Sequence, residues 1–268
     1  MPPPLESSFR TLDFYNELIN WETHSKGKLG RVGIVGGCQK YSGACYFAAL
    51  SASLAFAELT YVYCENATQL KAMLPNSIVT DIKYFRDKNI FESPIIDTFL
   101  VGCGLGQEEF SDHVMNLILN WNIDPTEERS CIYDFEIPAI KKLPKKCIIL
   151  DADALQHKLT SAVIDWAHKS RVRLIMTCNN KEYAIISNLL ETKLHSDGMT
   201  FLDRLPNNFI VMQKGFIDQI YFGNQILKIE HYTSISRHPG GLGDILAGLT
   251  SGLCASTLFV TDLDCVTQ

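Results

Sequence analysis

The sequence predicts an α/β fold in which a mainly parallel central sheet is covered by helices on both faces. Short apolar runs alternate with segments of helical length along the chain, and this alternation is typical of a layered α/β domain. The runs are apolar throughout, as in parallel strands that are buried on both sides. With 268 residues, of which 46% are hydrophobic, the chain is long enough for one large core. We therefore expect a single domain over residues 1–268.

The strand candidates are rich in β-branched and aromatic residues, and several end in glycine or aspartate. In chain order they are RVGIVGG (31–37), LTYVYC (59–64), IDTFLVGCGLG (96–106), CIILDADAL (147–155), RLIMT (173–177) and FIVMQKG (209–215). Two further runs, IDQIYFG and QILKIE, predict a small antiparallel hairpin across Gly223 and Asn224.

Helices are expected between these strands. The Ala-rich stretch 44–58 favours a helix, and a second helical stretch from Ala67 to Leu74 is ended by Pro75. Residues 108–121 have an amphipathic helical pattern. The segment 122–146 is the most irregular part of the chain, and we interpret it as a surface insertion.

Two long stretches, 41–57 and 245–260, are almost free of charge but rich in Ser, Ala and Gly. Both are shorter than the roughly 20 apolar residues that a membrane span needs, so we expect helices buried in protein. The N-terminal residues include acids and no apolar core of a secretory signal. We therefore expect a soluble cytoplasmic protein with no membrane partner.

The charge and the cysteines exclude several classes of function. A net charge of −6 argues against binding to nucleic acid or to an anionic membrane. The cysteines contain no C-x-x-C pair and are odd in number, which indicates free thiols in a reducing compartment rather than a disulfide framework or a zinc site. They are residues 38, 45, 64, 103, 131, 147, 178, 254 and 265.

The stretch HPGGLGDILAG, residues 238–248, is the first candidate site. Gly240, Gly241 and Gly243 allow the backbone to approach a phosphate closely, and the helix that begins near Asp244 directs unpaired amides towards it. Asp244 would then accept the proton of a hydroxyl that attacks the phosphate. The alternative is an aspartate cap after a glycine turn, with the preceding Arg237 and His238 as solvated loop residues.

The second candidate is the stretch Asn179 to Glu182, which follows a strand and opens a helix. A glutamate in a first helical turn is ordinarily a cap. Beside a nucleotide, however, this N-x-x-E pair suits Glu182 to hold Mg²⁺ through water, because Mg²⁺ keeps several of its waters.

Other strand ends carry weaker signals. Lys214 and Gly215 could bring an ammonium group close to phosphates, although a polar residue at a strand end is common. Asp151 and Asp153 could be paired carboxylates, or one of them could cap the next helix. The glycines of 102–106 do not fit the dinucleotide fingerprint G-x-G-x-x-G, and no Walker A lysine is present.

The motifs together resemble the ribokinase-like superfamily and, within it, the ADP/ATP-dependent NAD(P)H-hydrate dehydratase family. The resemblance covers roughly residues 24–254 and follows the family's order. Its stretches are KGKLGRVGIVGG (26–37), YSGACYFAALSA (41–52), VGCGLG (101–106), LDADAL (150–155), MTCNNKEY (176–183), QKGFID (213–218) and PGGLGDILAG (239–248). The chain departs from the family where Cys45, Cys103 and Cys178 replace prolines and Ala154 replaces a glycine.

The resemblance implies a ribokinase-like three-layer fold and a metabolite-repair enzyme. Such an enzyme phosphorylates the ring hydroxyl of hydrated NADH or NADPH with ATP or ADP, in the presence of Mg²⁺, and then eliminates phosphate. It also implies that family helices beyond the Asp244 helix are missing here. Either these helices are dispensable, or a partner subunit covers the exposed face, or the chain is a shortened form; of these we expect a homo-oligomer.

Residue by residue, the resemblance makes Asp244 the catalytic base and a substrate contact. The other substrate contacts that it implies are Gly106, Asn179, Asn180, Lys181, Glu182, Tyr183, Ala184 and Ile185. The implied nucleotide contacts are Lys214, Gly215, Phe216, Ile217, Asp218, Ser234, Ile235, Ser236, Arg237, His238, Pro239, Gly240, Gly241, Leu242 and Gly243.

Two alternatives remain from the sequence. A kinase of the same fold that acts on a small vitamin-precursor alcohol would give a stable phosphorylated product. An inactive nucleotide-binding relative would bind nucleotide without turnover, although the presence of Asp244, Asn179 and Glu182 argues against it.

Overall fold

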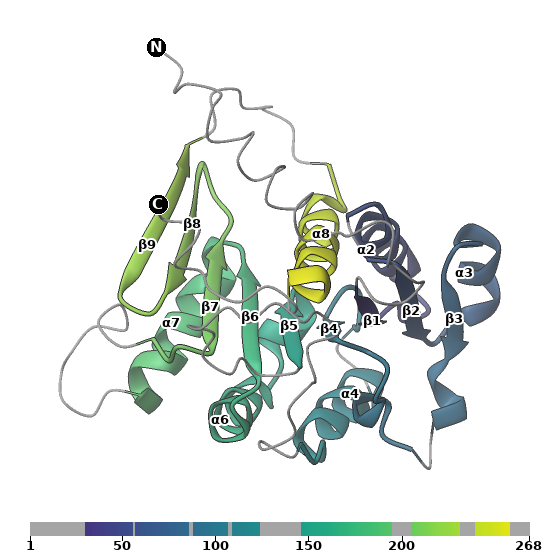
Figure 1. Ribbon diagram of the computed structural model, residues 1–268, viewed down its shortest axis with the longest axis horizontal. Helices are drawn as coiled ribbons and strands as arrows, with labels where there is room; N and C mark the ends of the chain where they lie inside the picture. The colour runs from purple at the N-terminus through teal and green to yellow at the C-terminus, as the bar shows by residue number, and fades with distance from the viewer. Residues whose placement is uncertain are drawn as a thin grey trace, which may run out of the picture.

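One mainly parallel sheet forms the centre of the computed structural model, which describes residues 30–55, 57–85, 88–106, 109–123, 146–194, 205–230 and 239–257 (Figure 1). Its described strands follow the order β3-β2-β1-β4-β5-β6-β7-β8-β9. Neighbouring strands from β3 to β7 are parallel, whereas β8 is antiparallel to both β7 and β9. The strands are β1 (Arg31–Val35), β2 (Leu59–Cys64), β3 (Ile78–Asp81), β4 (Thr98–Val101), β5 (Cys147–Asp151), β6 (Arg173–Cys178), β7 (Phe209–Gln213), β8 (Ile217–Phe222) and β9 (Gln225–Glu230).

Helices cover both faces of this sheet, so the predicted three-layer α/β architecture is confirmed (Figure 1). Helices α2, α3 and α8 pack on one face, and α4, α6 and α7 pack on the other. The helices are α2 (Ser42–Leu54), α3 (Ala67–Met73), α4 (Glu109–Leu119), α5 (Asp153–Gln156), α6 (Thr160–Ser170), α7 (Asn180–Leu194) and α8 (Leu242–Thr257), with two 3₁₀ turns, η1 (Ile82–Phe85) and η2 (Ile90–Glu92).

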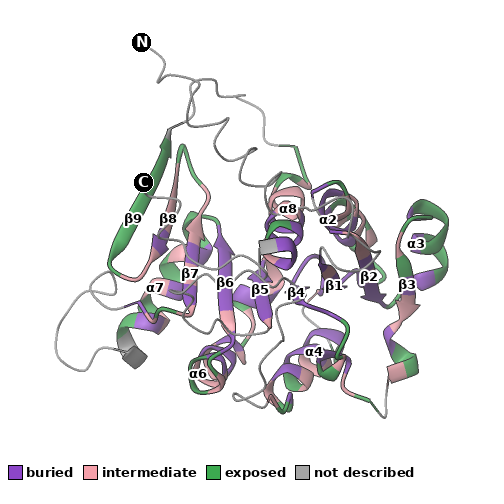
Figure 2. Ribbon diagram, viewed as in Figure 1, coloured by how far each residue is buried: buried purple, intermediate pink, exposed green. Residues whose placement is uncertain are grey.

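Side chains of the central strands alternate between the two apolar cores. In β5, Ile148 and Leu150 belong to the core under α4, α6 and α7, whereas Ile149 faces the core under α2 and α8. All five residues of β5 are buried, and Figure 2 shows buried strands along the middle of the sheet. Burial on both sides explains why these strands are apolar throughout.

Helices α2 and α8 pack closely because small residues line their contact. A methyl group at Gly248 would collide with the Ala48 carbonyl and the Ser51 hydroxyl, and one at Gly252 would collide with the Ala55 carbonyl. This contact confirms that the two uncharged stretches are helices packed in protein. No helix in the described ranges has both the length and the apolar character that crossing a bilayer requires.

The predicted strands and the hairpin across Gly223 and Asn224 are confirmed, with shifted ends. The strand expected over 96–106 stops at Val101, because the glycines after it form a turn. The short strand β3 was not predicted, because its four residues, IVTD, carry no local pattern that distinguishes them from a loop. Of the expected insertion 122–146, residues 124–145 lie outside the described part of the chain.

Candidate active site

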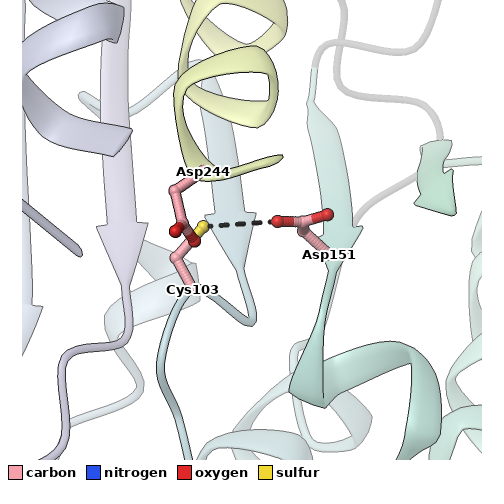
Figure 3. A group of neighbouring side chains, drawn as sticks. All are labelled: Cys103, Asp151 and Asp244. Atoms are coloured by element: carbon pink, nitrogen blue, oxygen red, sulfur yellow. Dashed lines mark hydrogen bonds between the residues drawn. The ribbon is translucent and has the colours of Figure 1, made fainter. Parts of the chain in front are cut away.

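The candidate site lies at the carboxyl ends of the parallel strands, beneath the first turn of α8. Asp151 is the last residue of β5, Cys103 follows β4, and Lys214 follows β7. Asp244 approaches them from the start of α8 (Figure 3). Ligands of open α/β folds bind at this edge of the sheet, so the topology alone brings these four side chains to one place.

The turn after β4 directs Cys103 towards Asp151. Gly102 has a φ of +128°, and a side chain there would collide with the carbonyl of Asp151. The Cys103 carbonyl accepts a hydrogen bond of 3.0 Å from the amide of Gly37, which fixes the turn against the end of β1. The glycine is therefore required for the close approach of this turn to β5.

Asp151 is the centre of the polar contacts at the site. Its side chain is 2% exposed, and its Oδ1 accepts hydrogen bonds from Thr177 Oγ1 at 2.7 Å and from Lys214 Nζ at 2.9 Å. Its Oδ2 lies 3.7 Å from Cys103 Sγ, which donates to it. Asp151 and Thr177 are also register partners on β5 and β6, so the sheet itself aligns them.

Asp244 is held close to this cluster. The sulfur of Cys103 and one carboxylate oxygen from each of Asp151 and Asp244 all lie within 4.8 Å of one another. Burial raises the pKa of Asp244 and the charge of Asp151 raises it further, whereas a hydrogen bond from Cys103 and the charge of Lys214 lower it. Burial also raises the pKa of the Cys103 thiol well above its usual range, so the thiol keeps its single proton and donates it to one of the two carboxylates at a time.

The start of α8 provides an amide cradle. The first intrahelical hydrogen bond runs from the Ile245 amide to the Gly241 carbonyl at 2.9 Å, so the amides of the first helical turn have no acceptor within the helix. Gly241 has a φ of +93° and lies against the ring of Phe47, where a side chain would not fit. A side chain on Gly243 would lie 3.4 Å from Lys214 Nζ, which places the ammonium group beside the cradle.

Lys214 is fixed at both ends. Its amide donates to the Cys178 carbonyl at 2.7 Å, which continues the pairing of β6 with β7. Burial lowers the pKa of its ammonium group, but the charge and hydrogen bond of Asp151 together with the charge of Glu182 outweigh burial, and the pKa is raised. Lys214 is therefore a permanent cation at the start of α8.

Asn179 and Glu182 cap the start of α7 reciprocally. The Glu182 amide donates to Asn179 Oδ1 at 3.0 Å, and the Asn179 amide donates to Glu182 Oε2 at 2.8 Å. This is the capping-box geometry, which is the simpler of the two interpretations of this stretch of the sequence. Glu182 is 4% exposed and accepts from Gln156 at 3.3 Å. Burial raises its pKa, and the charge of Lys214 lowers it.

The remaining predicted contacts are spread around this centre. The Gly106 amide donates to Asp153 Oδ2 at 2.9 Å, and the Gly215 amide donates to Asp218 Oδ1 at 2.8 Å. Tyr183 instead stacks on Tyr221, with ring centroids 5.3 Å apart. Among the predicted contacts, the exposed side chains are those of Asn179, Asn180, Lys181, Ala184, Ile185, Phe216, Ile217, Pro239 and Leu242.

Lys214 lies within electrostatic or steric reach of Asp244, Gly243 and Glu182. Asn180 lies near Gly215, since its Oδ1 would be 3.6 Å from a side chain there. Pro239 and Gly240 lie in the turn before α8, and no atom would lie within 4 Å of a side chain on Gly240. The predicted contacts Ser234, Ile235, Ser236, Arg237 and His238 lie outside the described residues.

Sequence reasoning did not include Asp151, Thr177 or Cys103 among the site residues. The acids of LDADAL could be paired carboxylates on sequence grounds, but nothing local to the sequence indicates that Asp151 would pair with Lys214, 63 positions away. Asp153 lies in the first turn of α5, so the two acids have separate partners and do not form a carboxylate pair.

The chain is similar to known proteins over most of its length. Residues 32–268 match a family described as NAD(P)H-hydrate dehydratase. The rat ATP-dependent (S)-NAD(P)H-hydrate dehydratase is 35% identical over 228 residues, which are 83% of this chain and 61% of the rat protein. The mouse enzyme of that name is 34% identical, with the same coverage. The chain thus spans about three fifths of the length of these relatives.

Solved structures share the fold. A ribokinase-like superfamily protein from Enterococcus faecalis has a TM-score of 0.60 at 18% identity and covers 89% of this chain and 77% of its own. The ADP/ATP-dependent NAD(P)H-hydrate dehydratase from Bacillus subtilis, co-crystallised with ATP and Mg²⁺, has a TM-score of 0.58 at 19% identity. It covers 89% of this chain and 78% of its own. The expected ribokinase-like fold is therefore confirmed.

Proposed function

The chain belongs to the NAD(P)H-hydrate dehydratase family, and from this premise we propose that it converts hydrated NADH or NADPH back to the reduced cofactor, at the expense of a nucleotide. The observation that carries the proposal is the meeting of Asp244, Lys214 and the α8 amides at one edge of the sheet. Phosphoryl transfer needs a base, a cation and an anion cradle held in place, and these groups supply all three. The rat and mouse relatives are named ATP-dependent, which supports ATP over ADP as the donor.

Asp244 is proposed to accept the proton of the ring hydroxyl while its oxygen attacks the γ-phosphorus. The O–H bond breaks and an O–P bond forms, while the bond from the γ-phosphorus to the bridging oxygen breaks and ADP leaves. In the second step the C–O bond breaks, phosphate leaves with its electron pair, and the ring loses one proton to water. The reduced nicotinamide is thereby restored.

Lys214 and the first amides of α8 are proposed to bind the transferred phosphate. The ammonium group lies beside Gly243, where the positive end of the helix dipole favours an anion. The nucleotide contacts proposed with them are the stretch 214–218 and the loop residues 234–243, which includes Ser234 to His238. The stretch 179–185 and Gly106 are proposed to contact the hydrate.

Glu182 is proposed to hold Mg²⁺ through water. Both of its oxygens already accept one hydrogen bond, from Asn179 and from Gln156, but each oxygen has a second lone pair. Oxygen donors reached through retained waters fit the preferences of Mg²⁺. When bound, the ion would neutralise charge on the nucleotide phosphates.

Two broader features are also proposed. The β8–β9 hairpin exposes Ile217 and Ile226 on one face and Leu227 and Ile229 on the other. Exposed apolar side chains that gather in this way are typical of an interaction surface, so we propose a homo-oligomer that covers the hairpin. A monomer in light scattering would contradict this. We also propose a cytoplasmic location, because the seven described cysteines are free thiols, as in proteins of reducing compartments.

The test of the activity is recovery of the dihydronicotinamide absorbance. The protein is mixed with Mg²⁺ and chemically hydrated NADH or NADPH, and ATP or ADP is then added. Nucleotide-dependent recovery would support the dehydratase and identify the phosphate donor. A stable phosphorylated product without recovery would indicate a kinase, and nucleotide binding without turnover would indicate an inactive relative.

A further inference from the structure

We propose that Asp151 is a positioning residue that holds the Lys214 ammonium group at the phosphate cradle of α8. The inference rests on the proposed function, because it assigns Lys214 to the transferred phosphate. Asp151 does not itself touch nucleotide or hydrate in this scheme. It acts through Lys214.

The geometry around Asp151 is that of a fixed anchor. The carboxylate is almost fully buried, and its Oδ1 receives both the Lys214 ammonium group and the Thr177 hydroxyl. Thr177 is the register partner of Asp151 on the adjacent strand, so the anchor is built into the central sheet and not into a loop. Because Asp151 is held in place by the sheet, it does not move with the lysine. The position of Asp151 therefore sets the position of the Lys214 ammonium group.

The anchor places the cation where an anion would bind. Lysine is a flexible side chain whose ammonium group samples many positions when it is unpaired. Here the Nζ atom lies 2.9 Å from Asp151 Oδ1, and a side chain on Gly243 would be 3.4 Å from it. Preorganisation of this kind lowers the barrier of a transfer reaction, since the group need not be ordered in the transition state.

A purely structural ion pair is the competing explanation. Lys214 is only partly buried, with its side chain 22% exposed, so its charge remains accessible from the site while Asp151 is not. A pair that served stability alone would need no cation exposed beside an amide cradle. The two explanations differ in a measurable way, because a structural pair would change thermal stability without changing ATP affinity.

The pH profile of kcat/KM reports separately on the charge that Asp151 places beside Asp244. The groups that act on Asp244 are Asp151 at the end of β5, Cys103 after β4, Lys214 after β7 and Asp153 at the start of α5, and Asp244 also faces the thiol of Cys45 on α2. Replacement of Asp151 by asparagine removes one negative charge from this set. The acid limb of kcat/KM should then move to lower pH, because protonation of Asp244 loses the neighbouring charge that favours it.

The experiment compares Asp151→Asn with Asp112→Asn. Asp112 also pairs with a lysine, Lys158 at 2.8 Å, and contacts His157 at 2.9 Å. Its side chain is 42% exposed, so it provides the loss of an Asp–Lys pair at the surface. For Asp151→Asn we expect kcat to fall by roughly 100-fold, the scale of a misplaced reacting group. We expect ATP affinity by calorimetry to fall by about tenfold, the scale of one charged contact. Asp112→Asn should keep wild-type values for both.

Several outcomes would overturn the inference. Asp151→Asn with wild-type ATP affinity, even if its melting temperature falls, would make the pair purely structural. If Asp151→Asn does not fold, Thr177→Val removes one partner of the anchor while the charge remains, and wild-type ATP affinity in that variant would refute the anchor. If the wild-type protein restores no reduced cofactor, the proposed activity is wrong, but the ATP affinities still decide whether Asp151 positions Lys214.

Discussion

The carboxylates of Asp151 and Asp244 both lie close to the Cys103 thiol. One oxygen of each carboxylate and the Cys103 sulfur all lie within 4.8 Å of one another. Two carboxylates this close raise the cost of ionising both, and the buried, protonated thiol between them is the donor that offsets part of this cost. The pKa of Asp244, the base of the proposed reaction, is thus set by neighbours from the turn after β4 and from the end of β5. This arrangement gives Asp244 a pH dependence that differs from that of an exposed aspartate.

Activity should fall with acid at a higher pH than for an ordinary carboxylate. Asp244 must be ionised to accept a proton, and burial together with the charge of Asp151 raises its pKa. The acid limb of kcat/KM should follow that raised pKa. Asp244→Asn should lower kcat by roughly 10²–10⁴-fold, the usual contribution of a general base, while nucleotide binding by calorimetry stays largely intact. A near-normal rate in this variant would reduce Asp244 to a helix cap.

Cys103 should tune this base through its hydrogen bond. Cys103→Ala removes a donor that lowers the pKa of Asp244, so the acid limb of kcat/KM should move to higher pH. Cys103→Ser keeps a donor at the same place, and its limb should stay near that of the wild type. Equal shifts in the two variants would show that the volume of the side chain matters and the donor does not.

Much of this fold and part of the site could be predicted from the sequence, for physical reasons. Gly241, Gly243 and Asp244 are neighbours in sequence, so a cradle and a base at one helix start are visible locally. The Asp151–Lys214 pair joins residues 63 positions apart, and local patterns do not report which strand ends become neighbours in a sheet. The sequence does not decide between two roles for Glu182, because the same N-x-x-E spacing suits both a capping box and a water-mediated contact with Mg²⁺.

Glu182→Gln should separate those two roles. A glutamine oxygen can still accept the hydrogen bond from the Asn179 amide, as in other capping boxes, so the melting temperature should change little. The lost charge should raise the Mg²⁺ concentration needed for half-maximal activity. Glu182→Ala, which loses both the cap and the charge, should in addition lower the free energy of unfolding by about 1 kcal/mol. An unchanged Mg²⁺ requirement in Glu182→Gln would leave the residue with its capping role alone.

Gly241 should tolerate no side chain. Its φ of +93° is unfavourable for other residues, and a methyl group would lie 2.7 Å from the Phe47 ring. Gly241→Ala should lower the free energy of unfolding by about 1–3 kcal/mol and weaken nucleotide binding. Gly240→Ala adds the same methyl group where no atom lies within 4 Å, and its stability should stay within about 0.5 kcal/mol. In the double variant Phe47→Ala, Gly241→Ala, only the steric part of the loss should be relieved, which a double-mutant cycle would measure.

Gly248 should link stability to activity, because it sets how closely α8 approaches α2. A methyl group at Gly248 would collide with the backbone of Ala48, so Gly248→Ala should lower the free energy of unfolding by about 1–3 kcal/mol, as overpacked cores do. Gly43→Ala makes the same change in α2, where nothing lies within 4 Å, and the higher helix propensity of alanine should raise stability by up to about 1 kcal/mol. Since α8 also carries Asp244, one turn before Gly248, any outward shift of the helix moves the base away from Cys103 and Asp151. Gly248→Ala should therefore lose kcat as well as stability, measured below its melting temperature, whereas a variant that loses stability alone would show that the first turn of α8 is held by the cradle and not by α2.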